Sequence, residues 1–190
     1  MKKITVKQMT ICGIFAALMC IAGPLSIPIG PVPVSLTNLV IYFAVMIIGT
    51  KISLTSYIVY LLLGTVGLPV FSNSSGGVAK LVGPTGGYLV GFALMLVISG
   101  IAAELSKRNI VVTMLGMFIG TAVAYLFGTV WFVFQQKCSF AYAMGICVEP
   151  FIIFDLIKIV IAFILGKEIR KRLVKANLIS EKAIQKTDKE

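Results

Sequence analysis

Residues 110–132 read IVVTMLGMFIGTAVAYLFGTVWF, an uncharged run of 23 residues. A helix needs about 20 consecutive apolar residues to cross the hydrocarbon core of a bilayer, so this run is long enough to span a membrane. The whole chain of 190 residues has the same bias, with 58% hydrophobic and 13% charged residues, against about 45–50% and about 25% in soluble domains. The sequence therefore predicts an all-α integral membrane protein and excludes a soluble, disordered or disulfide-stabilised fold.

Six apolar stretches predict a bundle of six transmembrane helices, which form a single domain over residues 1–190. They cover about residues 9–27, 34–50, 52–68, 85–105, 110–132 and 150–166. The second and third stretches nearly meet at Lys51. A continuous helix there would be too long for one crossing, so we expect a tight turn at residues 49–51. A basic tail follows at residues 167–190.

The positive charges are distributed unevenly over this predicted topology. The net charge is +10, and 14 of the 17 lysines and arginines fall in the N-terminus, the short turns near Lys51 and Lys107, or the tail. Because cytoplasmic loops are enriched in Lys and Arg, we expect a multi-pass protein of the cytoplasmic membrane with both termini inside. The charge thus indicates a lipid bilayer as surroundings and no nucleic-acid partner, with the tail as a secondary surface for lipid headgroups or another protein.

The sequence lacks the residues of several catalytic sites. It contains no histidine, which excludes the Ser-His-Asp triad, Cys-His catalysis and the HExxH zinc site. A P-loop motif is also absent, and Asp155 is the only aspartate in a predicted span, whereas an intramembrane aspartyl protease needs two. We therefore expect no enzyme activity, no metal site and no cofactor. Cys138 and Cys147 share one loop, where they form either free thiols or a disulfide.

The loops predicted on the outer side are long and irregular. Residues 26–33 contain three prolines and are expected to be extended or turn-like. Residues 69–84 read PVFSNSSGGVAKLVGP, whose apolar side chains indicate a folded lid, with a plain connector as the alternative. Residues 133–149 form the third outer loop.

Asp155 and Lys158 lie inside the last apolar stretch. A charge at the centre of a membrane helix costs at least about 2.5–3.5 kcal/mol, so such residues face the protein interior and have partners. Their spacing of three places them on one helix face, where they can pair. A carboxylate only accepts hydrogen bonds and an ammonium only donates them, so the pair complements a ureido or amide group. The alternative is an ion pair that only holds the helix to its neighbours.

Further candidate residues lie at the outer ends of predicted helices. Thr85, Gly86 and Gly87 begin the fourth predicted helix, where unpaired N–H groups and the positive helix end suit a carboxylate ligand. The alternative there is simple N-capping by Thr85. Tyr88 follows the glycines and is a candidate aromatic wall, and Asn38 belongs to a polar patch near the outer end of the second predicted helix.

Small residues at a spacing of four allow helices to approach each other closely. The fifth predicted helix carries such a stripe at Gly116, Gly120, Ala124 and Gly128. We expect that stripe to pack inside the bundle. Gly13 and Ala17 form a shorter pair in the first predicted helix, for which internal packing is again the default expectation.

Four segments of the sequence resemble the BioY family, the biotin-specific S components of energy-coupling-factor (ECF) transporters. They are IPIGPVPV at residues 27–34, YLLLGTVGLPVF at 60–71, GPTGGYLVGF at 83–92 and FDLIK at 154–158. The resemblance covers about residues 5–170. It implies the ECF S-component fold and high-affinity binding and uptake of biotin. It also implies assembly with a transmembrane coupling protein and two ATP-binding-cassette ATPases, which alone use ATP.

The resemblance further implies where biotin lies. Its fused ureido ring is expected against Asp155 and Lys158. Its valerate carboxylate is expected to meet Lys80 or the backbone N–H groups of residues 83–88. Asn38 follows a threonine that stands where family members often carry glutamine, and it is the candidate to replace that contact.

The resemblance also implies a docking surface, because Gly13 and Ala17 match the AxxxA contact of the family with its coupling protein, with Gly13 in place of the first alanine. A second hypothesis, based on the residues alone, is a self-sufficient proton- or ion-coupled carrier that uses Asp155. Biotin uptake that follows an imposed proton gradient in vesicles without any ATPase would favour this second hypothesis.

Labelling of single cysteines tests the predicted topology. In a variant without the native cysteines, Ser74→Cys is expected to react with a membrane-impermeant thiol reagent in intact cells, because its loop is predicted to lie outside. Lys186→Cys is expected to react only after permeabilisation. Reaction of position 186 in intact cells, with position 74 protected, would contradict the topology.

Overall fold

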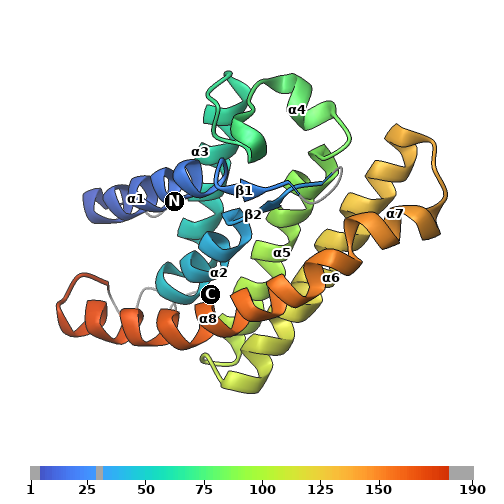
Figure 1. Cartoon of the computed structure of the whole chain (residues 1–190). Helices are drawn as coiled ribbons and strands as arrows, with labels where there is room; N and C mark the ends of the chain where they lie inside the picture. Colours follow the sequence, from blue (N-terminus) through green and yellow to red (C-terminus); the bar gives the residue numbers. More distant parts are fainter. Residues whose placement is uncertain (1–4, 29–31, 180–190) are drawn as a thin grey trace, which may run out of the picture.

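A computed structural model describes residues 5–28 and 32–179 (Figure 1). Within these residues the chain forms eight α-helices, a short 3-10 helix at Ser72–Ser74 and a two-stranded antiparallel hairpin. The helices are α1 (Val6–Ala22), α2 (Thr37–Ile48), α3 (Thr50–Thr65), α4 (Val78–Val82), α5 (Gly86–Leu105), α6 (Ile110–Gln136), α7 (Phe140–Cys147) and α8 (Glu149–Lys175). The hairpin consists of β1 (Ser26–Ile27) and β2 (Val34–Ser35).

The helices pack so that both described ends of the chain lie on one side of the bundle. α5 and α6 form a long antiparallel pair, α2 packs against α8, and α1 packs against α3. The start of α1 and the end of α8 lie at the left of Figure 1, whereas α4 lies at the top, α7 at the right and the hairpin near the middle. The ammonium of Lys7 donates a hydrogen bond to the carbonyl of Asn177 and joins the two chain ends.

Two helices in the described part of the chain, α5 and α6, are long and apolar enough to cross a membrane by length and composition. α5 begins within one residue of the expected start at residue 85, and α6 begins at Ile110 as expected but continues to Gln136 instead of residue 132. α1 and α2 are apolar but shorter, with 17 and 12 residues. The structure is thus mostly helical, as the composition predicts.

The predicted ends of the first two helices are wrong where they face the hairpin. α1 ends at Ala22 rather than at residue 27, because Pro24 has no N–H group to continue the helical hydrogen bonds. α2 begins at Thr37 rather than at residue 34, because β2 pairs with β1 just before it. The extended geometry expected for residues 26–33 occurs at Ser26–Ile27 in β1, and β2 follows this loop at Val34–Ser35. Residues 29–31 lie outside the described part of the chain.

The turn expected between the second and third helices is at Gly49, whose φ of 82° lies in the left-handed region that favours glycine. A carboxylate oxygen of Glu104 accepts hydrogen bonds from the N–H group (2.7 Å) and the hydroxyl group (2.8 Å) of Thr50 at the start of α3. Arg108 donates to the carbonyl of Met46 near the end of α2 (3.3 Å). Both charges match the helix dipoles, so the connection between α5 and α6 stabilises this turn.

The third and sixth predicted helices also need correction. α3 ends at Thr65 instead of residue 68. α8 continues to Lys175, nine residues beyond the expected end at residue 166. The apolar run ends at the first lysine of the tail, but lysine and arginine have high helix propensity and so allow the helix to continue. Arg172 also pairs with Glu168 one turn away (3.1 Å). The first part of the basic tail is therefore helical.

The second and third loops that the sequence predicts on the outer side are both folded. Phe71 is fully buried, and its ring meets the ring of Tyr60 edge-on with centroids 5.4 Å apart. The segment at residues 69–84 also contains the 3-10 helix and α4, so the expectation of a folded element is confirmed. α7, in the third loop, is not predicted from the sequence. The hydroxyl of Ser139 caps it by accepting a hydrogen bond from the N–H group of Tyr142 (3.3 Å).

The small-residue stripe of α6 packs against α5, as expected. A Cβ atom added at Gly116 would lie 2.2 Å from the Cβ of Ala102, and one added at Gly128 would lie 2.3 Å from the ring of Tyr88. Both distances are shorter than any normal contact between such atoms. The stripe therefore allows the two longest apolar helices to lie close together.

Gly128→Ala is expected to lower the free energy of unfolding by about 1–3 kcal/mol, the usual cost of overpacking, because the new methyl group meets the Tyr88 ring. Gly145→Ala on α7 is the matched control, since a Cβ there has no neighbour within 4 Å. It is expected to be neutral or to stabilise the helix by up to about 1 kcal/mol. Thermal unfolding of the purified variants in detergent measures both, and equal stability of the two variants would contradict this packing.

Candidate binding site

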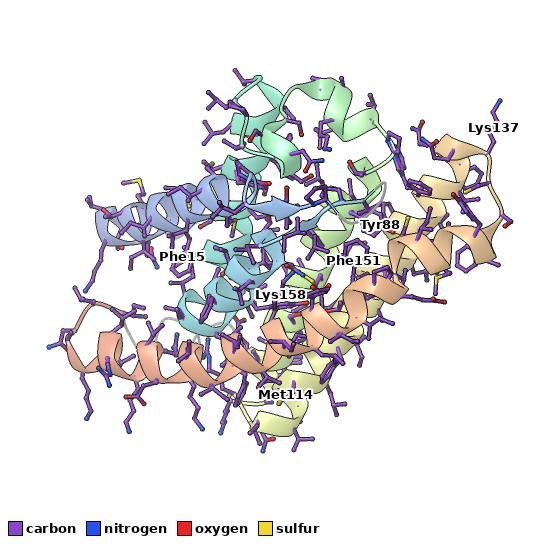
Figure 2. The ribbon with its side chains drawn as sticks, viewed as in Figure 1. Phe15, Tyr88, Met114, Lys137, Phe151 and Lys158 are labelled. Carbon is purple, nitrogen blue, oxygen red and sulfur yellow. The ribbon has the colours of Figure 1, made fainter. Side chains whose placement is uncertain are left out.

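A pocket lies where the hairpin, the folded segment at residues 69–84 and six further helices, α2, α3, α5, α6, α7 and α8, meet. It is lined by Val32, Pro33, Val34, Ser35, Thr37, Asn38, Tyr60, Ser72, Lys80, Thr85, Tyr88, Leu89, Phe92, Tyr125, Cys147, Phe151, Asp155 and Lys158. Lys158 lies near the middle of the molecule, and Tyr88 and Phe151 lie on its α7 side (Figure 2). Six of the eight residues predicted to bind a ligand are among these, namely Asp155, Lys158, Asn38, Tyr88, Thr85 and Lys80.

The polar part of the pocket is a buried ion pair. The ammonium of Lys158 lies 3.0 Å from Oδ1 of Asp155, and the two residues are 7% and 5% exposed. The side-chain amide of Asn38, itself 3% exposed, donates to the same carboxylate oxygen (2.8 Å) and accepts from Lys158 through its own Oδ1 (2.9 Å). The pairing expected from the spacing of Asp155 and Lys158 is present, and Asn38 completes a closed network of three side chains.

Every donor of Lys158 has an acceptor in this structure. An ammonium group has three N–H donors, and those of Lys158 point to Oδ1 of Asp155, Oδ1 of Asn38 and the carbonyl oxygen of Ser35 in β2 (2.9 Å). A buried charge pair is stable only when its remaining hydrogen bonds are also satisfied. The network therefore connects the hairpin, the start of α2 and the middle of α8.

Tyr125 belongs to the same network, although sequence reasoning does not single it out from the other aromatic residues. Its hydroxyl donates to Oδ2 of Asp155 at 2.5 Å, from the neighbouring helix α6. Most aromatic residues in membrane helices serve as packing or interface residues, so composition alone does not identify this role. The nearest sequence signal is the position of Tyr125 beside Ala124 in the small-residue stripe.

The start of α5 differs from the expected carboxylate site. Thr85 occupies the N-cap position, but its side chain makes no capping hydrogen bond. A Cβ at Gly86 would lie 1.6 Å from the carbonyl oxygen of Leu81, and one at Gly87 would lie 2.3 Å from the Cβ of Trp131. Neither glycine lines the pocket. They allow α5 to approach α4 and α6 rather than a ligand.

Two backbone donors at this helix start are already used within the chain. The N–H group of Gly86 donates to the carbonyl of Gly83 (3.0 Å), and that of Tyr88 donates to the carbonyl of Thr85 (3.2 Å). The hydroxyl of Tyr88 bonds with the hydroxyl of Thr129 (3.1 Å). Tyr88 therefore presents its ring, and not its hydroxyl, as a wall of the pocket.

Lys80 is a second cation of the pocket and comes from α4, on the folded segment at residues 69–84. Burial lowers the pKa of Lys80 below its ordinary value. The indole N–H of Trp131 donates to the carbonyl of Gly83 (2.9 Å), and the amide of Gln135 donates to the carbonyl of Val82 (2.7 Å). These two bonds attach the segment that carries Lys80 to the C-terminal part of α6.

The remaining candidates lie outside the polar network. Cys138 and Cys147 are free thiols, so the disulfide left open by the sequence is not formed in this structure. Gly13 and Ala17 are exposed on α1, and a Cβ at Gly13 has no neighbour within 4 Å. The default expectation of internal packing for that pair is therefore wrong. Within residues 5–28 and 32–179, no group of three or more Cys, Asp or Glu side chains is placed to hold a metal ion.

Comparison with known proteins assigns this arrangement to a family. The family model described as "BioY family" matches residues 1–175. The chain belongs to the BioY family. This agrees with the resemblance found in the four sequence segments, and the match includes every residue of the pocket.

Full-length relatives of this BioY chain have names that describe transport. The biotin transporter BioY of Thermotoga maritima is 36% identical over 165 residues, which is 87% of this chain and 96% of the relative. The probable biotin transporter BioY of Pyrococcus horikoshii is 31% identical over 164 residues, 86% of this chain and 96% of the relative. These relatives are transporters rather than enzymes.

A solved structure is similar to this BioY chain over most of its length. It is the S-component for biotin from an ECF-type ABC transporter, with a TM-score of 0.81 and 27% sequence identity. The similarity covers 89% of this chain and 95% of that one. The helices, hairpin and folded outer segments described above thus form an ECF S-component fold.

Proposed function

We propose that this protein binds biotin with high affinity and takes it up across the cytoplasmic membrane, as the substrate-specificity subunit of an ECF transporter. The observation that carries the proposal is the buried network of Asp155, Lys158 and Asn38 at the side of a mostly apolar pocket. The relatives named as biotin transporters and the similar S-component for biotin support the choice of ligand.

Biotin combines the groups that such a pocket complements. Its ureido ring has two N–H donors beside a carbonyl oxygen, so Asp155 accepts one N–H and Lys158 donates to the oxygen. Lys158 then exchanges one of its three present acceptors for the ureido oxygen, and Asn38 holds the pair. The sulfur-containing ring lies against apolar and aromatic walls such as Tyr88 and Phe151.

The valerate carboxylate extends in this proposal toward Lys80 and Thr85, on the side closed by residues 69–84. The pKa of Lys80 is lowered by burial, and a carboxylate beside it would favour the charged ammonium. Gly86 and Gly87 contribute indirectly, because their lack of side chains lets α5 pack against α4 and α6.

In the membrane, α1, α2, α3, α5, α6 and α8 are the six crossing helices of the proposal, and α4 and α7 lie at the outer surface. Both termini lie in the cytoplasm. The common location of the described chain ends, away from α4 and α7, supports this topology. The uneven distribution of Lys and Arg supports the orientation.

Energy for uptake comes in this proposal from separate subunits, a transmembrane coupling protein and two ATP-binding-cassette ATPases. The chain carries no cofactor, and ATP is used only by those partners. Gly13 and Ala17 form the docking face on α1, which their exposure supports. The self-sufficient carrier is less favoured, because the similar solved structure is the S-component of an ECF-type ABC transporter.

Asp155→Asn is expected to weaken biotin binding about tenfold to a hundredfold, since a hydrogen bond to a charged group is worth about 1.5–3 kcal/mol and about 1.4 kcal/mol changes affinity tenfold. Lys158→Ala is expected to weaken binding similarly and also to destabilise the fold by leaving Asp155 unpaired. Calorimetric titration and thermal unfolding of the same purified proteins separate recognition from stability. Lipoate, which has a similar carboxylate chain but no ureido group, is the ligand control and is not expected to bind.

A folded Asp155→Asn protein with the affinity of the wild type would eliminate the ureido contact. Wild-type protein that fails to bind biotin would eliminate the proposed function itself. Loss of stability with unchanged affinity would mean that the ion pair only holds α8 to its neighbours.

Ala17→Leu and Gly13→Leu are expected to leave biotin affinity within about twofold of the wild type but to reduce assembly with the coupling protein and uptake severalfold or more. A bulky side chain on a small-residue face prevents close helix approach. Ala141→Leu is the control, because Ala141 is also small and exposed but lies on α7 at the opposite end. Co-purification and uptake of labelled biotin measure the effect, and normal assembly of both α1 variants would refute the docking face.

A further inference from the structure

The two oxygens of the Asp155 carboxylate have different surroundings. Oδ1 accepts hydrogen bonds from Asn38 (2.8 Å) and Lys158 (3.0 Å), which fill both of its lone-pair positions. Oδ2 accepts from the hydroxyl of Tyr125 (2.5 Å), its one partner among the described residues. One acceptor position therefore remains on Oδ2, beside Tyr125, and both residues line the pocket.

Tyr125 reaches this oxygen because α6 packs closely on α5. The preceding residue, Ala124, is buried, and a Cβ at Gly91 of α5 would lie 3.0 Å from its Cα. Tyr125 itself is half-buried and spans from α6 to α8. Oδ1 of the carboxylate is thus bound by residues of α2 and α8, and Oδ2 is bound by a residue of α6.

We propose that Tyr125 is a positioning residue for ligand recognition, an inference that rests on the proposed function. Its hydroxyl prevents the carboxylate of Asp155 from turning about the contacts at Oδ1. It also fills one lone-pair position of Oδ2, so that a single position is left for a ureido N–H of the ligand. Without the hydroxyl, Oδ2 has two open positions and no fixed direction.

A purely structural hydroxyl would behave differently. It would satisfy a buried acceptor, and its removal would lower stability without changing the affinity of the folded protein. The positioning role requires a loss of affinity that depends on Asp155. A double-mutant cycle between the two residues separates these cases.

Tyr125→Phe is expected to weaken biotin binding about tenfold, as measured by calorimetric titration of the purified protein. In the Asp155→Asn background the same change is expected to weaken binding by less than about threefold, because the charge that Tyr125 orients is gone. Tyr142→Phe, which removes the hydroxyl of an exposed tyrosine on α7, is expected to leave affinity unchanged. Unchanged affinity in Tyr125→Phe, or a full tenfold loss in both backgrounds, overturns the positioning role.

A spectroscopic readout tests the contact without any ligand. Asp155 and Asp188 are the two aspartates of the sequence, so Asp188→Asn leaves Asp155 as the single aspartate. With ¹³C in the aspartate carboxylate, its infrared stretching bands report on Asp155 alone. Tyr125→Phe is expected to shift these bands in the ligand-free protein, and Tyr142→Phe is not.

The two measurements distinguish failure of this inference from failure of the proposed function. Bands that do not move in Tyr125→Phe overturn the positioning role, whether or not biotin binds. A band shift in Tyr125→Phe, combined with wild-type protein that does not bind biotin, overturns the proposed function, and the role of Tyr125 in biotin recognition fails with it.

Discussion

The ion pair between Asp155 and Lys158 is the interaction on which the rest of the structure depends. A single unpaired charge at this depth costs at least about 2.5–3.5 kcal/mol, so the bundle must supply partners from several elements. Asn38 comes from α2, and the carbonyl of Ser35 comes from the hairpin. The network therefore determines how the hairpin and α2 lie against α8, and one acceptor position of Asp155 Oδ2 stays open beside the pocket.

Close packing of α5 on α6 is the second requirement, because it places the aromatic residues of the pocket. The missing side chain of Gly128 makes room for the ring of Tyr88, and the contact between Gly91 and Ala124 places Tyr125 within reach of Asp155. Backbone approach in a membrane relies on small residues, since lipid is as apolar as the helix surface. Van der Waals packing thus positions the side chains whose polar ends complete the site.

Local patterns in the sequence predict part of this arrangement, and contacts over long sequence distances account for the rest. Asp155 and Lys158 are three residues apart, so helix geometry alone indicates that they pair. Asn38 lies 117 residues from Asp155 in the sequence. The sequence therefore predicts that Asn38 lies near the outer end of its helix, but it does not predict that Asn38 contacts Asp155. The length of the apolar run predicts the start of α8 correctly. It ends at the first lysines of the tail, whereas the helix continues through them because Lys and Arg have high helix propensity. Gly86 and Gly87 have the pattern of a ligand-binding helix start, yet Leu81 and Trp131 occupy the space beside them.

The same small-residue pattern has opposite outcomes in two helices, since it is covered on α6 and exposed on α1. On α6 the glycines face atoms of α5 at distances that exclude any side chain, whereas Gly13 on α1 faces no atom within 4 Å. Neither outcome follows from the spacing, because spacing shows only that a close approach is possible. A small-residue face that the chain does not cover itself is available to another helix, and it lies on a helix that contributes no residue to the pocket. If this face is the docking face of the proposed function, substitutions there are therefore expected to leave the pocket unchanged.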